Sequence, residues 1–152
     1  MAFFDSMKIN LFSDMRGVVM LNGDPVEGVL LKRVAVPGSG KEYRDEVITG
    51  AKGQFVFSRM ETSSVMKLLP GNSSVFQQMT IEYQGKEYLA WRIGAASDRY
   101  KGELNDDDVL GSGKEIDIDL VCELTATETM KSAADLTVVS GICTWVGAEI
   151  IE

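Results

Sequence analysis

The carboxylates are the side chains of this sequence with the clearest chemical potential. Three of them, Asp106, Asp107 and Asp108, are consecutive, and Glu103 and Asn105 stand just before them. Oxygen clusters attract hard cations such as Ca²⁺, yet the spacing of an EF-hand loop is absent and consecutive acids cannot all face one ion. The sequence therefore predicts a solvated acidic loop with no bound metal, and a Ca²⁺ site is the alternative.

A second group of carboxylates alternates with apolar residues shortly after this loop. The acidic side chains on one face are Glu115, Asp117, Asp119 and Glu123. The apolar side chains on the other face are Ile116, Ile118, Leu120, Cys122 and Leu124. Because side chains alternate across a strand, this pattern predicts a β-strand with one buried face and one acidic face, on which neighbouring charges lie about 7 Å apart. The acidic face is either merely solvated or a docking surface for a basic partner protein.

Other patterns associated with catalysis or nucleotide binding are incomplete. The segment 35–41 begins like a phosphate-binding loop, but Glu42 follows where such a loop needs a Ser or Thr to hold Mg²⁺, and a strand pattern replaces the required helix. The chain has no histidine, which excludes nucleophilic sites with an imidazole base and most zinc sites. No nucleophile stands next to an evident base. We therefore expect no enzymatic activity and no cofactor.

Two cysteines and two tryptophans lie within apolar, strand-like stretches. Free cysteines are commonly buried, so we expect Cys122 and Cys143 to be reduced thiols in the core; a single disulfide between neighbouring strands is the alternative. Trp91 and Trp145 are expected in the core rather than on the surface as platforms for a ligand.

The length and charge of the chain limit its class. The 152 residues favour a single domain spanning 1–152, and the net charge of −8 makes nucleic acid and anionic membranes unsuitable partners. No apolar run approaches the length of a membrane span, and the N-terminus has no basic region followed by an apolar run. The expected location is therefore the cytoplasm.

Apolar and polar residues alternate with a period of two over most of the chain, so β-strands are expected to position these side chains. The clearest hairpin joins 79–83 to 87–93 through Gln84, Gly85 and Lys86. Further strands are predicted at Gly17–Leu21, Gly28–Val36, Tyr43–Thr49, Gln54–Ser58, Val65–Leu69, Leu136–Ser140 and Ile142–Ile151. Helix is expected only in the first residues and at Thr127–Ala134. Short strands between turns with Gly and Pro indicate an all-β, antiparallel sandwich or barrel. Its core should include Phe55, Phe57, Leu89, Trp91, Ile116, Ile118 and Leu120.

Two segments of the N-terminal half resemble a known domain family. Residues 17–29 combine a strand that begins with Gly, a tight turn with Gly23 and Pro25, and a second strand after Gly28; the segment 49–57 follows. Over residues 15–70 they are similar to the carboxypeptidase regulatory-like, or transthyretin-like, β-sandwich domains, with Gly50 where that family usually has an Asp. The resemblance implies a Greek-key-like sandwich, completed by residues 71–152 with a C-terminal extension.

The resemblance also implies a structural or interaction module with no active site. The whole chain is similar to small bacterial proteins that carry this domain at their N-terminus. We expect Gly23, Pro25 and Gly28 to link the first two strands of the sandwich, with Pro25 outside the hydrogen-bonded ladder because it has no N–H to donate.

These observations lead to a hypothesis about function. Small size, acidity and the absence of a catalytic constellation favour a non-enzymatic protein that binds another, basic protein, such as a bacterial immunity or antitoxin-type protein. The residues expected to contact the partner are Asp106, Asp107, Asp108, Glu115, Asp117, Asp119 and Glu123. The alternative is a structural module, or one that binds a small ligand or carbohydrate.

Overall fold

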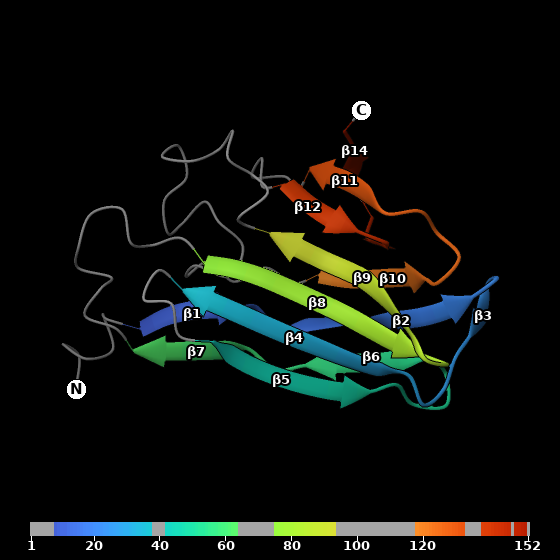
Figure 1. The fold of residues 1–152 in the computed structure, drawn as a ribbon, viewed down its shortest axis with the longest axis horizontal. Coiled ribbons are helices and arrows are strands. Elements are labelled where there is room, and N and C mark those ends of the chain that lie inside the picture. Colours follow the sequence, from blue (N-terminus) through green and yellow to red (C-terminus); the bar gives the residue numbers. More distant parts are fainter. Residues whose placement is uncertain are drawn as a thin grey trace.

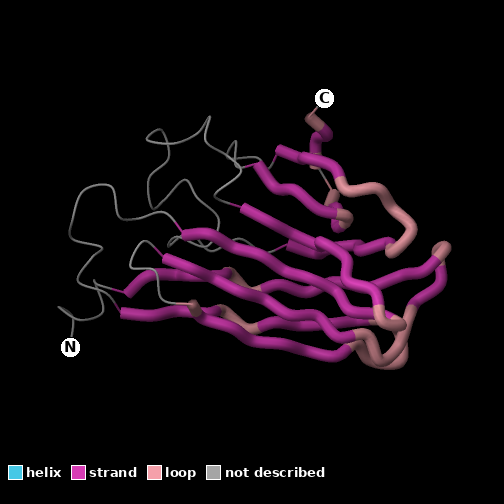
Figure 2. Tube along the Cα trace, viewed as in Figure 1, coloured by secondary structure: helices cyan, strands magenta, loops and turns pink. Residues whose placement is uncertain are grey.

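The computed structural model describes residues 8–37, 42–63, 75–93, 118–132, 138–146 and 148–151, and all regular elements within them are β-strands (Figures 1 and 2). The expected all-β class is therefore confirmed. No helix suited to crossing a membrane occurs in this described part of the chain. The strands are β1 Lys8–Phe12, β2 Met15–Leu21, β3 Asp24–Pro25, β4 Leu30–Pro37, β5 Tyr43–Ile48, β6 Gln54–Phe57, β7 Met60–Ser63, β8 Val75–Tyr83, β9 Lys86–Ile93, β10 Ile118–Glu123, β11 Thr129–Ser132, β12 Val138–Gly141, β13 Cys143–Thr144 and β14 Glu149–Ile150.

The strands form two main sheets and a short ribbon. The larger sheet has the order β14-β11-β12-β9-β8-β4-β5, and the smaller has the order β13-β10-β2-β3, with β6 also paired to β2. The ribbon consists of β1 and β7. The pairings are antiparallel except that β10 runs parallel to β2, with Ile118 opposite Met15 and Glu123 opposite Met20. This parallel pair departs from the antiparallel prediction, because β10 enters beside β2 in the same direction instead of returning from it through a hairpin.

One hydrophobic core lies between the sheets. The larger sheet contributes the inward row Leu31, Ala35, Met79, Ile81 and Trp91, and the smaller sheet contributes Val19, Phe55, Phe57, Leu120 and Cys122. Burial of Phe55, Phe57, Trp91 and Leu120 was predicted and is confirmed. Ile116 and the side chain of Ile118 lie outside the described residues.

The prediction that Leu89 belongs to the core is wrong. Met79 pairs with Trp91 whereas the next residue, Thr80, pairs with Leu89, so Ala90 is an extra residue in β9. Such a bulge shifts the alternation of side chains by one position. Ala90 and Trp91 are consequently both buried, and Leu89 is half-buried beside Thr80 on the outer face. The β8–β9 hairpin itself is as expected, with a turn of two residues, Gln84 and Gly85, that both have positive φ.

The link between β2 and β4 is close to the expected one. Asn22 and Gly23 have φ values of 53° and 84° and form the tight turn, and Gly28 (φ 77°) precedes β4. However, Pro25 is not outside the ladder, since it pairs with Met20 as the last residue of β3. A two-residue strand at the edge of a sheet tolerates a proline because only one of its sides is paired.

Other departures concern short elements near the ends of the chain. The helix expected at Thr127–Ala134 is replaced by β11, and the single strand expected at Ile142–Ile151 is divided into β13 and β14. The sequence pattern missed β1 and β7. The strand expected at Val65–Leu69 and the helix expected in the first residues lie outside the described residues.

Candidate functional site

The predicted acidic face is only partly described by the structure. On β10, Leu120 and Cys122 are buried while Asp119 and Val121 are exposed, so the faces of this strand were assigned correctly. Asp119 and Glu123 therefore both project outward from β10. The other predicted partner-binding residues, Asp106, Asp107, Asp108, Glu115 and Asp117, lie outside the described residues.

Asp119 is already paired with a cation of the same face. It lies opposite Arg16 of the parallel strand β2, and Arg16 Nε donates to Asp119 Oδ1. Both side chains are exposed, by 53% for Arg16 and 73% for Asp119. Exposed ion pairs contribute little to stability, but the positive charge of Arg16 offsets the negative charge that Asp119 alone would present to a partner.

Glu123 has a structural role that the alternating pattern did not predict. One carboxylate oxygen accepts a hydrogen bond from Gly23 N (2.7 Å), and the other accepts from Asn22 N (3.0 Å), Thr125 N (2.9 Å) and Thr125 Oγ1 (2.7 Å). The bonds from Thr125, together with those from Gly23 and Asn22, lower the pKa of Glu123 to about 2. The charge of Glu123 therefore holds the β2–β3 turn against the end of β10.

Apolar and polar side chains alternate over the rest of this outer face. In one row Gln54, Val18, Val121 and Thr144 lie side by side across four strands. In the next row Val56 lies beside the Arg16–Asp119 pair. Val56 and Val121 are 66% and 40% exposed. The face thus has two exposed valines, Val121 on β10 and Val56 on β6, among polar and charged groups, and such mixed surfaces also occur in protein interfaces.

Arg33, on the inner face of β4, is a charged residue with several internal contacts. Its guanidinium is fully buried and forms a two-point pair with Asp45, with Nε at 2.9 Å and Nη2 at 2.7 Å from the two carboxylate oxygens. Nη1 and Nη2 also donate to the carbonyl oxygens of Ser13 and Ser58. The guanidinium carbon lies 4.5 Å and 4.2 Å from the ring centres of Phe12 and Phe57.

This arginine cluster is a structural element of the core. All three guanidinium nitrogens of Arg33 donate within the protein, and the side chain is fully buried beside the rings of Phe12 and Phe57, so it is not exposed to a substrate. Its contacts join β4 and β5 of the larger sheet to the loops before β2 and after β6. The sequence contains no signal for this cluster beyond one arginine at an inward position of a predicted strand.

The two cysteines form a disulfide, which corrects the expectation of reduced thiols. Cys122 on β10 lies opposite Cys143 on β13, and their Cα atoms are 4.1 Å apart. Both residues are fully buried. The alternative bridge between neighbouring strands is therefore the one the structure contains, because β13 crosses to the smaller sheet instead of continuing β12.

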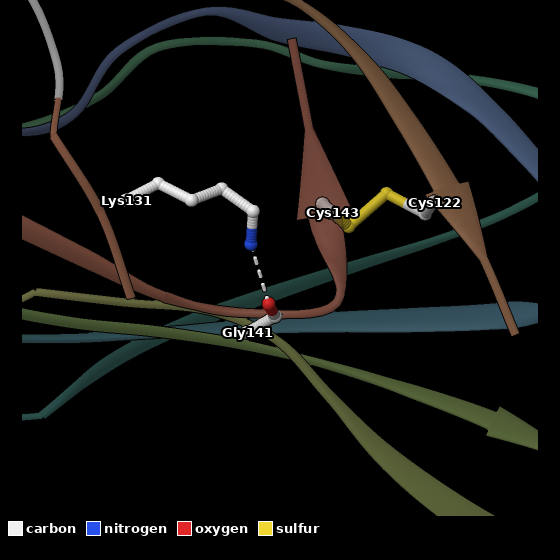
Figure 3. The surroundings of a disulfide bond; sticks show 4 residues. All are labelled: Cys122, Lys131, Gly141 and Cys143. Atoms are coloured by element: carbon white, nitrogen blue, oxygen red, sulfur yellow. Dashed lines mark hydrogen bonds between the residues drawn. A yellow bond between two sulfur atoms is a disulfide. The ribbon is translucent and has the colours of Figure 1, made fainter. Parts of the chain in front are cut away.

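A buried lysine lies near this disulfide (Figure 3). Lys131 is 3% exposed, and its amine donates to the carbonyl oxygen of Gly141 at 2.7 Å and, more weakly, to that of Thr129 at 3.4 Å. Burial lowers the pKa of Lys131 because the protein interior disfavours the charged amine. The contact fixes the residue at which the chain leaves the larger sheet.

The described residues contain neither a metal-ligand group nor an exposed aromatic platform. No cluster of three His, Cys, Asp or Glu side chains suited to a metal occurs in the part of the chain that the structure describes. Trp91 is buried, and its indole N–H donates to Gln77. Trp145 is half-buried with its ring centre 5.6 Å from that of Trp91. Both tryptophans therefore pack with the core, as expected.

Comparison with known proteins gives one family and several solved structures that are partly similar to this chain. No curated protein sequence matches this chain. Among solved structures, the dioxygenase domain of a dioxygenase carbohydrate-binding protein fusion from Streptomyces sp. SirexAA-E is 20% identical, with a TM-score of 0.43, over 74% of this chain and 79% of that one. Catechol 1,2-dioxygenases from Acinetobacter sp. ADP1 and Pseudomonas arvilla C-1 are 12% and 18% identical, with a TM-score of 0.41 each. They cover 94% and 93% of this chain and are covered over 51% and 50% of their own length.

The family match covers most of the sandwich. It runs from the first residue of β2 to just beyond β10, and so includes Arg33 with its partner Asp45, Glu123 and the first cysteine of the disulfide. It does not carry the name of the carboxypeptidase regulatory-like or transthyretin-like domains that residues 15–70 resemble. Residues 15–127 match the model described as Domain of unknown function (DUF6795), and the chain belongs to this family.

Proposed function

We propose that this protein is a non-enzymatic binding domain that docks to another protein with a basic surface. The observation that carries the proposal is the distribution of charge along the chain. The described acids of the β10 face are engaged, Asp119 by Arg16 and Glu123 by the β2–β3 turn. The excess negative charge is concentrated in residues 94–117, which lead into β10: their acids are Asp98, Glu103, Asp106, Asp107, Asp108, Glu115 and Asp117, and their basic residues are Arg99, Lys101 and Lys114.

Charge of this kind acts mainly on the rate of association. A negatively charged surface attracts a basic partner over a distance of about a Debye length, roughly 8 Å at physiological ionic strength. Contact residues then determine how long the complex lasts, and the exposed valines Val121 of β10 and Val56 of β6 on the same outer face are suited to that contact. A bacterial immunity or antitoxin-type protein is the specific version of this proposal.

The finer structural proposal concerns residues 15–70. We assign this segment to a sandwich of the carboxypeptidase regulatory-like or transthyretin-like kind, on the basis of the turn at Gly23 and Pro25, the position of Gly28, and the corner after Thr49. The Thr49 hydroxyl donates to Val26 O and accepts from Val29 N, which supports such a corner. Modules of this kind serve in structure and interaction, and a cytoplasmic location belongs to the same proposal.

The test is a comparison of association rates between charge variants. The partner is first isolated by pull-down from the native lysate, and binding is then followed by stopped flow at low and high salt. The triple variant Asp106→Asn, Asp107→Asn, Asp108→Asn keeps the side-chain shapes and removes three charges. We expect association at low salt to slow by about 3-fold to 10-fold and the difference to vanish at high salt.

A matched control separates local attraction from total charge. The variant Glu27→Gln, Glu61→Gln, Glu128→Gln removes the same number of charges from exposed positions elsewhere. This control should associate faster than the aspartate variant. Equal rates for the wild type and the aspartate variant at low salt would show that the acidic segment is only solvated, and the proposed docking mode would be wrong.

A further inference from the structure

Near its C-terminus the chain crosses from the larger sheet to the smaller sheet and back. β12 belongs to the larger sheet, β13 to the smaller one, and β14 to the larger one again, on the other side of β11. Figure 1 shows β11, β12 and β14 together above the end of β10. The described residues 142–146 and 148 thus belong to a strap that leaves the larger sheet, reaches β10 and returns. The strap is defined here as these described residues, 142–146 and 148.

Both ends of the strap are anchored in the larger sheet. At the first end, β12 pairs with β11 at four positions, Lys131 binds the Gly141 carbonyl, and Ile142 N donates to Leu89 O at 3.0 Å. Gly141 has φ 138° and lies so close to the backbone of Ala90 that no side chain fits there. At the second end, β14 pairs with β11, and Ile151 N donates to Met130 O at 2.8 Å.

The middle of the strap is held mainly by the disulfide. β13 pairs with β10 at two positions only, Val121 with Thr144 and Cys122 with Cys143. It forms the edge of the smaller sheet, so its other side has no strand partner among the described residues. Elsewhere in the strap, Ile142 and Cys143 are buried in the core, and the Trp145 ring lies against that of Trp91. In Figure 3, the Lys131 side chain lies to one side of the Gly141 carbonyl and the disulfide lies to the other. Lys131 holds Gly141, and the disulfide holds Cys143.

We propose that Cys122–Cys143 is a redox-operated latch, and that its reduction by a dithiol frees the strap from β10 while the two sheets stay folded. A thiolate of the dithiol attacks one cystine sulfur and breaks the S–S bond, and its second thiol then displaces the protein sulfur from the mixed disulfide. Two electrons and two protons pass to the protein, which gains two thiols, and the dithiol becomes a cyclic disulfide.

The architecture explains why opening stays local. The anchors at Gly141 and β14 are hydrogen bonds within the larger sheet and do not depend on the disulfide. Short edge elements with few backbone bonds open at a lower free energy than core strands, and such opening admits the reductant to sulfurs that are buried in the closed state. Once the latch is open, the edge of β10 at Val121 and Cys122 loses its neighbour, and Trp91 loses the cover of Trp145.

Hydrogen exchange of the whole protein tests this proposal. The native protein is compared before and after incubation with dithiothreitol, and loss of the bond is verified by thiol alkylation and mass measurement. We expect exchange to rise at least tenfold in peptides covering 143–148 and at the β10 edge, while β4 and β8 remain protected. Trp145 fluorescence should increase, because the nearby disulfide no longer quenches it and the contact with Trp91 is lost.

Three results would overturn the proposal. Exchange that rises throughout β4 and β8 would show that the disulfide is a general staple of the fold. Unchanged exchange in the strap after verified reduction would show that the two pairs with β10 suffice to hold it. A disulfide that stays intact under native conditions would show that the strap does not open. The double variant Cys122→Ala, Cys143→Ala gives an independent measurement, since it should reproduce the exchange pattern of the reduced protein in the absence of any reductant.

Discussion

Arg33 shows what a single buried charge contributes to this sandwich. Replacing it with Lys keeps one positive charge but removes the fork that binds Asp45 and the carbonyl oxygens of Ser13 and Ser58 together. The acceptors that lose a bond to Arg33 would be left unpaired, which is costly in a buried site. We therefore expect Arg33→Lys to lower the free energy of unfolding by about 3–5 kcal/mol. Urea denaturation measures this value. Arg44→Lys, on the exposed face of β5, is the control and should change it by less than about 0.5 kcal/mol. A loss below about 1 kcal/mol for Arg33→Lys would contradict the assigned role.

Glu123 gives a prediction about pH at the same scale. Its pKa in the folded protein is about 2, below the usual value of 4.5, so its carboxylate stabilises the fold fully above that usual value. This stabilisation should be lost as the pH falls from about 5 to about 2, because the unfolded state then binds the proton more readily. In Glu123→Gln the contribution is absent at every pH.

The difference in unfolding free energy between wild type and Glu123→Gln should therefore shrink as the pH falls through this range. Urea denaturation at pH 7, 5 and 3 measures it, and an NMR titration of the Glu123 carboxyl gives the pKa directly. Glu128→Gln, at an exposed position of the following turn, is the control. A difference that stays constant between pH 7 and pH 3 would show that the hydrogen bonds to the β2–β3 turn do not depend on the charge.

Among the elements, β12 depends on one glycine. Gly141 has φ 138°, and a Cβ at this position would collide with the backbone of Ala90 in the bulge of β9. We expect Gly141→Ala to lower the unfolding free energy by about 2–4 kcal/mol, since backbone strain and the displacement of β9 add together. Gly85→Ala is a matched control: Gly85 also has positive φ (77°), but nothing lies within 4 Å of its Cβ position. It should cost about 1 kcal/mol, and equal losses for the two variants would contradict this account.

The elements also show what the sequence could predict. Alternation located β2, β4, β5, β6 and the β8–β9 hairpin, because in each of them one face is more buried than the other. The pattern failed where one added residue, Ala90, shifts the faces of β9, and where β13 changes sheets after Gly141. Neither the bulge nor the change of sheet follows from the residue types next to it in the sequence. Each is set by the strand that pairs with the segment in the folded protein. The same holds for the acidic face. The outward direction of Asp119 could be predicted from alternation, but its pairing with Arg16 could not, because Arg16 is distant in sequence and reaches Asp119 only through the parallel β2–β10 pair.

At the scale of the whole molecule, the net charge of −8 should oppose folding slightly. Like charges are closer together in the folded state, and salt screens their repulsion. We therefore expect NaCl up to 0.3 M to raise the free energy of unfolding by on the order of 0.5 kcal/mol, the scale of surface electrostatic effects. The variant with Asp106, Asp107 and Asp108 changed to Asn should show a smaller rise, because part of the repulsion is already removed. Urea denaturation at several salt concentrations measures both, with KCl as a check that the response is one of ionic strength. A fall in stability with salt would show that attractive pairs such as Arg16–Asp119 outweigh the repulsion between the excess negative charges. The net charge would then not destabilise the folded domain.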